Sequence, residues 1–432
     1  MLTGKSTYSR AKSLIPGGTQ LLSKRPELFS TEWPAYYKSA KGVKIIGLDD
    51  AIFTDISIMG VGAAVLGYAD DDVDDAVIRT IKNGVQTSLI SPLEVELAET
   101  LLELHPWFEG VRYAKSGGEA IAIAVRIARA ATGRDKIFFS GYHGWHDWYL
   151  AANLADSSAL DSELMPGLSP NGVPRSLRGT SYPIDLSDID TSIQNAKALP
   201  ADIACIIIEP ARGEALGKEV LNKLRKYCDA HNIVLIFDEI TSGFRSCVGG
   251  MHRLGDTKPD MAVLAKGMTN GYPLAAILGI GSVMDRAQKT FISSTNWTEA
   301  TGLAAALATI HKYQAVDAAK KINFIGSMLK SIWETAFAKH GLDCSVSGID
   351  SLPAFKLNHK DELRFYNFFV SEMLSKGILA FRQLKPSTAH SAEDLKLYGH
   401  CMEETLEKYN NTNRDLTSYA PVQTGFHRLT KE

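Results

Sequence analysis

The chain has 432 residues, a net charge of −3, 45% hydrophobic and 22% charged residues, and five scattered cysteines without a CxxC pair. This length is typical of two or three packed domains. The small net charge and the absence of a basic run give no electrostatic reason to expect binding to nucleic acid or to an anionic membrane. The cysteine usage, the absence of an apolar leader and the lack of any apolar stretch of roughly 18 residues predict a cytoplasmic protein without membrane spans.

The first elements in chain order form a predicted hairpin followed by helices. Residues 43–48 and 52–56 flank the turn pair Asp49-Asp50, which indicates two antiparallel strands. From about residue 70 the pattern becomes helical and then alternates with short apolar strands. Helices are predicted at residues 74–83, 93–104 and 120–131, and a strand at 136–139.

Three uninterrupted apolar runs predict buried parallel strands, at residues 204–208, 233–237 and 261–265. A helix at 219–231 between the first two completes a βαβ unit. The predicted fold class is therefore α/β, with a mainly parallel sheet covered by helices on both faces. The tail from Asp317, with a helix, a strand and another helix, predicts a smaller α+β domain.

These patterns predict three parts of the chain. Residues 1–69 would form an N-terminal segment with the hairpin that packs with the small domain. Residues 70–316 would form the large α/β domain, and residues 317–432 the C-terminal small domain.

A polar residue follows each of the three apolar runs: Glu209, Asp238 and Lys266. In open α/β sheets, ligands bind beyond the carboxyl ends of the strands, so these side chains are expected to converge on one crevice. A solvated loop charge remains the alternative for any one of them taken alone.

Two further segments suggest ligand contacts. Ser116-Gly117-Gly118 opens a predicted helix, which suits a phosphate and equally an ordinary N-cap. Tyr142-His143-Gly144-Trp145-His146 follows the strand at 136–139, where its rings could stack on a flat cofactor. His143, His146 and Asp147 lack the spacing of a familiar zinc site, so no metal is predicted.

The order of these motifs resembles the class III aminotransferases, within the fold-type I pyridoxal-phosphate (PLP) enzymes, and most of all the glutamate-1-semialdehyde aminomutase branch. The likeness runs from about Pro16 to His390. Its strongest carriers are Asp238-Glu239-Ile240 with Thr241-Ser242-Gly243-Phe244-Arg245, then Pro259-Asp260 leading to Lys266-Gly267, and Pro273-Leu274.

The resemblance implies PLP as cofactor and assigns roles around it. Lys266 would hold PLP as a Schiff base and then move protons, and its apolar surroundings would lower its pKa. Asp238 would keep the pyridine nitrogen protonated. Tyr142 would stack on the ring and Ile240 would pack against its other face.

The remaining cofactor contacts also follow from the resemblance. Ser116, Gly117 and Gly118 would hold the phosphate. Thr295 aligns with a threonine that reaches the phosphate of a neighbouring subunit, which implies a homodimer with shared active sites. His143 and Glu209 complete the cofactor-site candidates, with Glu209 expected as structural support rather than as an acid.

The region expected to bind substrate departs from the aminomutases. Lys24 stands where their arginine binds a carboxylate, Met59-Gly60-Val61-Gly62-Ala63 lacks their tryptophan, and Asn296-Trp297-Thr298-Glu299 replaces Ser-Gly-Asn-Pro. Lys24, Arg212 and Arg382 are the candidate substrate contacts.

The leading hypothesis is an enzyme that transfers an amino group between two small molecules. L-Glutamate is the expected donor, and the acceptor an aldehyde or ketone, with an oxo-sugar of surface-polysaccharide synthesis preferred from the resemblance of residues 294–299. Two alternatives stay open: glutamate-1-semialdehyde 2,1-aminomutase in tetrapyrrole synthesis, and a non-catalytic protein of the same fold.

Overall fold

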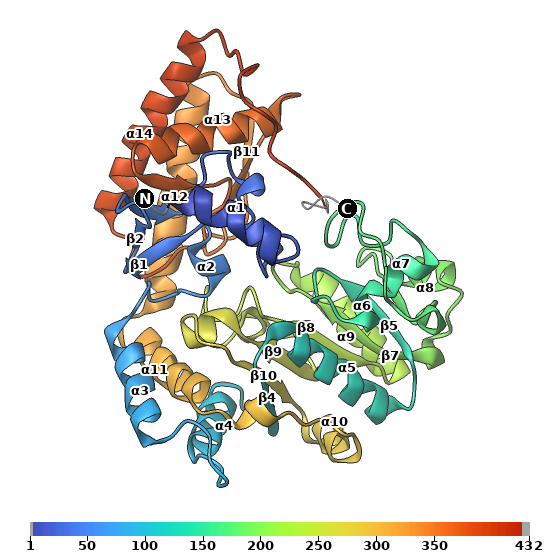
Figure 1. Ribbon diagram of the computed structural model, residues 1–432. Coiled ribbons are helices and arrows are strands. Elements are labelled where there is room, and N and C mark those ends of the chain that lie inside the picture. The colour runs from blue at the N-terminus through green and yellow to red at the C-terminus, as the bar shows by residue number, and fades with distance from the viewer. Residues whose placement is uncertain (1–2, 426–432) are drawn as a thin grey trace. The chain divides into compact units, whose positions relative to one another are not determined.

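The computed structural model describes residues 3–425 and divides the chain into two compact units. The larger unit is Asp71–Ala319, and the smaller unit combines Met1–Asp70 with Lys320–Glu432. Each unit has its own sheet, as Figure 1 shows for both. Among residues 3–425, no helix combines the length and the apolar character needed to cross a bilayer.

The larger unit is built on a seven-stranded sheet of order β4-β10-β9-β8-β7-β5-β6. Its strands are β4 (Gly110–Ala114), β5 (Lys136–Ser140), β6 (Ser181–Pro183), β7 (Ile203–Ile208), β8 (Val234–Asp238), β9 (Met261–Leu264) and β10 (Ala275–Gly279). Neighbouring strands from β6 to β9 are parallel, whereas β10 runs antiparallel to both β9 and β4. The predicted, mainly parallel sheet is confirmed.

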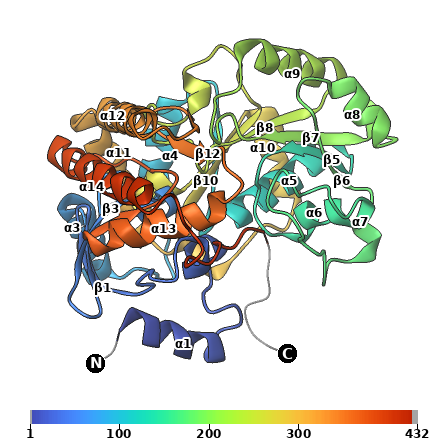
Figure 2. The ribbon, with the colours of Figure 1, turned by 90° about the horizontal axis from the view of Figure 1, so that it is seen from above.

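Helices cover both faces of this sheet, as Figure 2 shows: α5 (Gly117–Thr132) on one side, and α8 (Ile189–Asn195) and α9 (Lys218–His231) on the other. Successive strand residues alternate between the two faces. Ile207 and Ile236 pack in the α5 core, whereas Ile206 and Leu235 pack with α8 and α9. This two-sided burial explains why the strands are apolar without interruption.

The other helices of the larger unit are α3 (Asp71–Asn83), α4 (Leu93–Leu104), α6 (Asp147–Leu150), α7 (Ala152–Ala155), α10 (Gly281–Met284) and α11 (Thr301–Ala315). Helix α11 packs against α3 and α4. All predicted helices and strands of this unit are present, within a few residues at their ends. Strands β4, β6 and β10 were not predicted.

The smaller unit carries a four-stranded sheet of order β1-β2-β3-β13. The predicted hairpin is β2 (Lys44–Gly47) with β3 (Ile52–Ile56), preceded by β1 (Tyr37–Lys41). Strand β13 (Ile378–Ala380) pairs in parallel with β3. The tail holds more elements than predicted, because β11 (Cys344–Ser347) and β12 (Ala354–Leu357) form a separate hairpin.

The helices of this unit are α1 (Gly4–Leu14), α2 (Met59–Gly62), α12 (Ala318–Lys339), α13 (Glu362–Ser375) and α14 (Ala392–Asn411). One apolar core joins α12, α13 and α14 to the sheet, with Trp333, Phe369 and Tyr398 at its centre. The indole N–H of Trp333 donates to the hydroxyl of Tyr398 at 2.8 Å, which satisfies a polar group inside that core.

Candidate active site

The three predicted polar residues meet at one edge of the larger sheet. Strands β7, β8 and β9 are parallel neighbours, so their carboxyl ends lie side by side. Glu209 follows β7, Asp238 ends β8 and Lys266 follows β9 by two residues. The charges of Glu209 and Asp238 both act on the pKa of Lys266, so the three side chains lie near one another at this edge.

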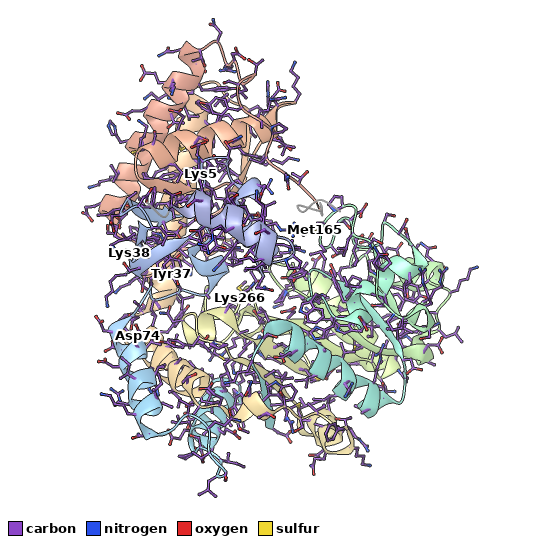
Figure 3. All side chains as sticks on the ribbon, in the orientation of Figure 1. Lys5, Tyr37, Lys38, Asp74, Met165 and Lys266 are labelled. Carbon is purple, nitrogen blue, oxygen red and sulfur yellow. The ribbon has the colours of Figure 1, made fainter. Side chains whose placement is uncertain are left out.

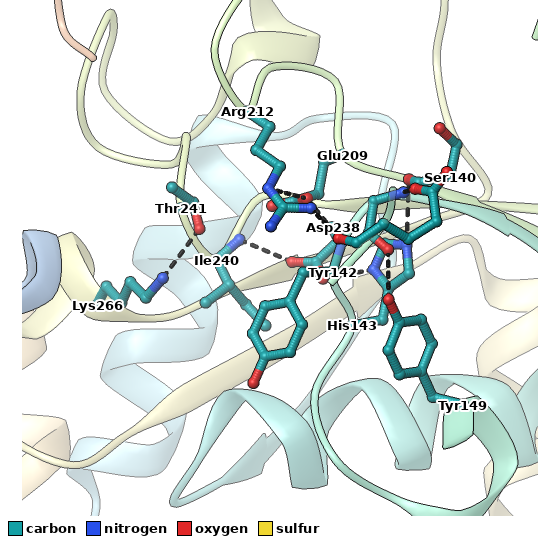
Figure 4. Close-up of polar contacts among 12 residues, drawn as sticks. Ser140, Tyr142, His143, Tyr149, Glu209, Arg212, Asp238, Ile240, Thr241 and Lys266 are labelled. Carbon is teal, nitrogen blue, oxygen red and sulfur yellow. Dashed lines mark hydrogen bonds and ion pairs between the residues drawn. The ribbon is translucent and has the colours of Figure 1, made fainter. Parts of the chain in front are cut away.

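Lys266 begins the 3₁₀ turn Lys266–Thr269 and lies within the larger unit (Figure 3). Its φ of 45° falls in the left-handed region, which is uncommon for a residue with a side chain and often marks a functional position. Its Nζ bonds to Oγ1 of Thr241 at 2.9 Å (Figure 4). Burial lowers the pKa of Lys266, against the opposing pull of Glu209 and Asp238, which favours the neutral amine that can act as a nucleophile.

Asp238 is a buried carboxylate with both oxygens engaged. Its Oδ2 accepts from Nδ1 of His143 at 2.8 Å, and its Oδ1 accepts from the backbone N–H of Ile240 at 3.0 Å. Asp238 is 2% exposed and His143 is 1% exposed. This pairing fixes the direction of the carboxylate at the strand end (Figure 4).

His143 does not offer a free ring face for stacking. Its faces and edges pack against Phe139, Trp148 and Tyr149, and its Nε2 lies 3.2 Å from the carbonyl oxygen of Ser140. The ring is therefore occupied by contacts with Asp238 and its aromatic neighbours, and these contacts do not favour the expected stacking of His143 on a flat cofactor.

Glu209 holds the loop that carries Tyr142. Its Oε2 accepts from the backbone N–H of Tyr142 at 2.9 Å and lies 3.6 Å from Nε of Arg212. Burial is the first cause that raises the pKa of Glu209, followed by repulsion from Asp238. The expected structural role of Glu209 fits these contacts. Arg212 also donates to the carbonyl of Glu163, so its guanidinium is partly committed to the protein.

The amino end of α5 is a capped helix start with two glycines. Ser116 is the N-cap, and Glu119 receives the N–H of Ser116 at 2.9 Å in a capping box. The N–H groups of Gly117 and Gly118, in the first turn, have no intrahelical acceptor. A Cβ on Gly117 would lie 2.7 Å from Cδ1 of Ile240, so any larger residue there would displace the Ile240 side chain.

The other predicted contacts lie in separate places. Thr295 begins the 3₁₀ turn Thr295–Thr298 in the larger unit, and its carbonyl accepts from Nε2 of Gln86 at 2.6 Å. Lys24 and Arg382 belong to the smaller unit. The guanidinium of Arg382 lies over the ring of Tyr366, with 5.4 Å to its centroid. Their roles with substrate stay predictions.

Sequence reasoning gave no role to two residues that the site uses. Thr241 is the partner of Lys266, and its signal was its place three residues after Asp238 in the same loop. Glu163 accepts the N–H of Gly141 at 2.5 Å, but it lies far along the chain and offered no signal. The loop at 141–142 is thus held by two carboxylates from different segments.

The chain is similar to several known proteins along nearly its whole length. A 3-aminobutyryl-CoA aminotransferase of Cloacimonas acidaminovorans (strain Evry) is 31% identical over 421 residues, covering 93% of this chain and 96% of that protein. A glutamate-1-semialdehyde 2,1-aminomutase of Francisella philomiragia is 30% identical, covering 91% and 96%. The FumI protein of Sphingopyxis sp. MTA144, solved with PLP, has the same fold with a TM-score of 0.85, 23% identity and coverage of 97% and 99%.

The fold is that of the fold-type I PLP-dependent enzymes. Residues 29–406 match the family described as aminotransferase class-III, and the chain belongs to that family. It is therefore a PLP-dependent aminotransferase, as the sequence predicted, and the hypothesis of a non-catalytic protein is not supported.

The residues present fit this cofactor. PLP offers an aldehyde, a pyridine nitrogen and a phosphate. The site offers the amine of Lys266, the oriented carboxylate of Asp238 and the helix amino end at Gly117 and Gly118, where the backbone N–H groups have no intrahelical acceptor.

Proposed function

We propose that this aminotransferase moves an amino group from L-glutamate to an aldehyde or keto acceptor, with Lys266 as the residue that binds PLP covalently. The observation that carries the proposal is the buried Lys266 amine, with its lowered pKa, beside the two carboxylates at the sheet edge. A buried lysine that is costly to charge is suited to nucleophilic and base chemistry, and offers little as a structural ion.

The protein's part in the reaction is to bind, orient and move protons. When bound, PLP supplies a carbonyl for the amino group and a ring that draws electron density from the substrate carbon. Asp238 would hold a proton at the pyridine nitrogen, and the bond from His143 would keep the Asp238 carboxylate in a fixed direction. Lys266 Nζ would take the proton from the substrate carbon that bears the amino group and would deliver it to the carbon on the other side of that nitrogen.

The segments around Asp238 orient the ring. Ile240 follows Asp238 by two residues and packs against Gly117, which links the ring site to the helix amino end. We assign Tyr142 to the opposite ring face, since Glu209 fixes its backbone N–H (Figure 4). Ser116, Gly117 and Gly118 are assigned to the phosphate.

An oxo-sugar is the acceptor class that we propose to test first, because residues 294–299 resemble those of aminotransferases in surface-polysaccharide pathways. The relatives act on different molecules by name, a CoA thioester and an amino aldehyde, so identity near 30% leaves the acceptor open. Lys115 directly precedes Ser116, Gly117 and Gly118, the residues assigned to the phosphate. Its Nζ donates to Oε2 of Glu299 at 2.8 Å. The segment at residues 294–299 therefore also contacts the segment that leads into the proposed phosphate site.

The first test is the visible spectrum of the PLP-loaded protein before and after L-glutamate. The proposal expects the band of covalently bound PLP to bleach with glutamate and to return with a carbonyl acceptor, including oxo-sugars. Lys266→Ala should lack the original band, whereas the exposed Lys223→Ala should retain it. A wild-type band that no amino donor changes would reject the transamination.

The aminomutase remains a second candidate because of the 30% identity to the Francisella protein. It predicts conversion of glutamate 1-semialdehyde to 5-aminolevulinate without an external donor. Lack of that product by the PLP-loaded enzyme, under conditions where glutamate bleaches the band, would reject it.

We also propose a homodimer with shared active sites. Leu89 and Ile90 are 83% and 71% exposed and line a groove of about 680 Å³ together with Gln86 and Thr298. Large exposed apolar side chains around a groove are typical of an interface. Gln86 also bonds to Thr295, which ties the proposed phosphate contact to this surface.

Complementation tests the shared site. A mixture refolded from Lys266→Ala and Thr295→Asp chains should regain activity if one working site takes its lysine and its threonine from different subunits. If Thr295 acts within its own subunit, the mixture stays as inactive as the two parents. Leu89→Asp should shift the mass measured by light scattering from dimer to monomer, and an unchanged mass would contradict this interface.

A further inference from the structure

A buried carboxylate and imidazole, Glu239 and His252, lie next to the loop that carries Thr241 and have no part in the site described so far. Oε1 of Glu239 accepts from Nδ1 of His252 at 2.7 Å and from the backbone N–H of the same residue at 2.8 Å. Its Oε2 accepts from the hydroxyl of Ser242. All three residues are buried, and both carboxylate oxygens are committed to protein groups. Any effect of this pair on the reaction therefore passes through the protein rather than through contact with a ligand.

The surroundings hold the pair in one arrangement. A Cβ on Gly250 would lie 2.8 Å from Cδ of Glu239 and 2.8 Å from Nδ1 of His252, so the chain passes close over both side chains. The ring of His252 stacks on that of His105, with 5.1 Å between centroids and 23° between planes. Nδ1 of His105 in turn lies 2.7 Å from the carbonyl oxygen of Leu101 in α4. Burial raises the pKa of Glu239, but the hydrogen bonds that it accepts outweigh burial and lower the pKa overall, so the side chain stays a carboxylate.

The loop after β8 connects this pair to Lys266. The backbone N–H of Gly243 donates to the carbonyl oxygen of Glu239 at 2.7 Å, and a Cβ on Gly243 would lie only 2.6 Å from that oxygen, so the turn is tightly closed. Thr241 lies inside this turn, and its Oγ1 is 2.9 Å from Nζ of Lys266 (Figure 4). Glu239 thus binds the two residues that follow Thr241, Ser242 through its side chain and Gly243 through its backbone. A change at the Glu239 carboxylate is therefore transmitted to the hydroxyl of Thr241.

A buried carboxylate with its partners is a poor source of stability, because apolar side chains of similar volume are often equally stabilising. A fully satisfied polar network instead fixes one arrangement of the core. We propose that Glu239 and His252 are positioning residues that hold the hydroxyl of Thr241 against Nζ of Lys266 and so set the rate at which this lysine captures PLP. The inference rests on the proposed role of Lys266. Capture joins Nζ to the aldehyde carbon of PLP and releases water, and an amine held by Thr241 presents its lone pair in one direction.

The test is a double-variant cycle on the rate of PLP capture by the cofactor-free protein, followed by absorbance. His252→Phe keeps a ring against His105 but removes the donor to Glu239, and it should slow capture about two- to tenfold, the range expected for Thr241→Val. Because both substitutions act on the same contact, the variant that carries both should be no slower than Thr241→Val alone. A role in stability alone would not produce this lack of additivity.

A conservative variant and a control accompany the cycle. Glu239→Gln should capture PLP within about twofold of the wild-type rate, because an amide can accept from His252 through its oxygen and bond to Ser242 through its nitrogen. His400→Phe makes the same substitution at an exposed position of the smaller unit and should leave the rate unchanged. Thermal unfolding checks that each variant folds, and Ser242→Ala replaces His252→Phe in the cycle if the latter does not fold.

Two results would overturn the positioning role: a capture rate in His252→Phe equal to that of the wild type, or a slowing in the double variant equal to the product of the two single effects. Lys266→Ala separates this inference from the proposed function. If that variant no longer captures PLP, the role of Lys266 stands whatever the cycle shows. Covalent capture by Lys266→Ala at the wild-type rate would reject the proposed function itself.

Discussion

Gly117 offers a quantitative test of the contact between the helix amino end and the loop after Asp238. In Gly117→Ala, the new Cβ would lie 2.7 Å from Cδ1 of Ile240 and 3.3 and 3.4 Å from its Cγ2 and Cγ1. Overpacking of this kind costs about 1–3 kcal/mol, and the helical alanine regains about 0.4–1 kcal/mol. The difference between these two ranges is centred at about 1 kcal/mol, so we expect a net loss of about 1 kcal/mol in the free energy of unfolding.

A second substitution should remove that loss. Ile240→Val deletes Cδ1, the atom at 2.7 Å, and leaves only the contacts at 3.3 and 3.4 Å. By itself this change costs about 0.5–1.5 kcal/mol. The free energy of unfolding of the double variant should then lie within about 0.5 kcal/mol of that of Ile240→Val alone, which is a coupling of at least about 0.5 kcal/mol.

Urea unfolding of the cofactor-free variants measures these differences in the free energy of unfolding. The dissociation constant of PLP should rise in Gly117→Ala and return toward the wild-type value in the double variant. Gly255→Ala is the matched control, because a Cβ there meets nothing within 4 Å. Additive effects of the two substitutions on unfolding would refute the contact, as would a Gly117→Ala variant no less stable than the wild type.

Three other substitutions probe the site and the core. Asp238→Asn should slow the half-reaction with glutamate about 100-fold or more, and His143→Phe should slow it about tenfold, as measured by stopped-flow absorbance. Equal rates in both variants and the wild type would refute the role of the bond between His143 and Asp238. Thr241→Val removes the partner of Lys266 and should slow PLP capture by the cofactor-free protein about two- to tenfold, and an unchanged rate would contradict this. Burial lowers the pKa of His105 from 6.5 to about 3, so below pH 6.5 the unfolded chain binds a proton that the folded chain does not, and the folded state loses stability as the pH decreases. Between pH 7 and pH 5 this loss is about 2 kcal/mol in the free energy of unfolding. Urea unfolding at several pH values should show the loss in the wild type and not in His105→Phe.

The sequence predicted the parts of the fold that have a strong local pattern. Strands β7, β8 and β9 are buried on both faces, and that burial is visible as unbroken apolar runs. Strand β10 contains two alanines and a glycine, and β6 has three residues with a proline, so neither has a clear signal. The pairing of β13 with β3 joins segments more than 300 residues apart, which local patterns do not encode.

In the candidate site, too, the sequence predicted the residues that follow a strong local pattern and missed the contacts that depend on side-chain direction. Glu209, Asp238 and Lys266 were found because strand ends of a parallel sheet converge, whatever the distance along the chain. The bond from His143 to Asp238 required the side-chain direction after β5, and the sequence suggested a stacking ring instead. The bond from the N–H of Gly141 to Glu163 joins residues 22 positions apart, and only the three-dimensional structure reveals it.

The most direct test of the central claim is to reduce the PLP-loaded enzyme with borohydride and to locate the modified peptide by mass spectrometry. Reduction makes the bond between PLP and its lysine permanent. The structure predicts one modified residue, Lys266, whose buried amine lies at the carboxyl edge of the sheet. Stoichiometric label on another lysine, or bound PLP that leaves no label on Lys266, would contradict the account.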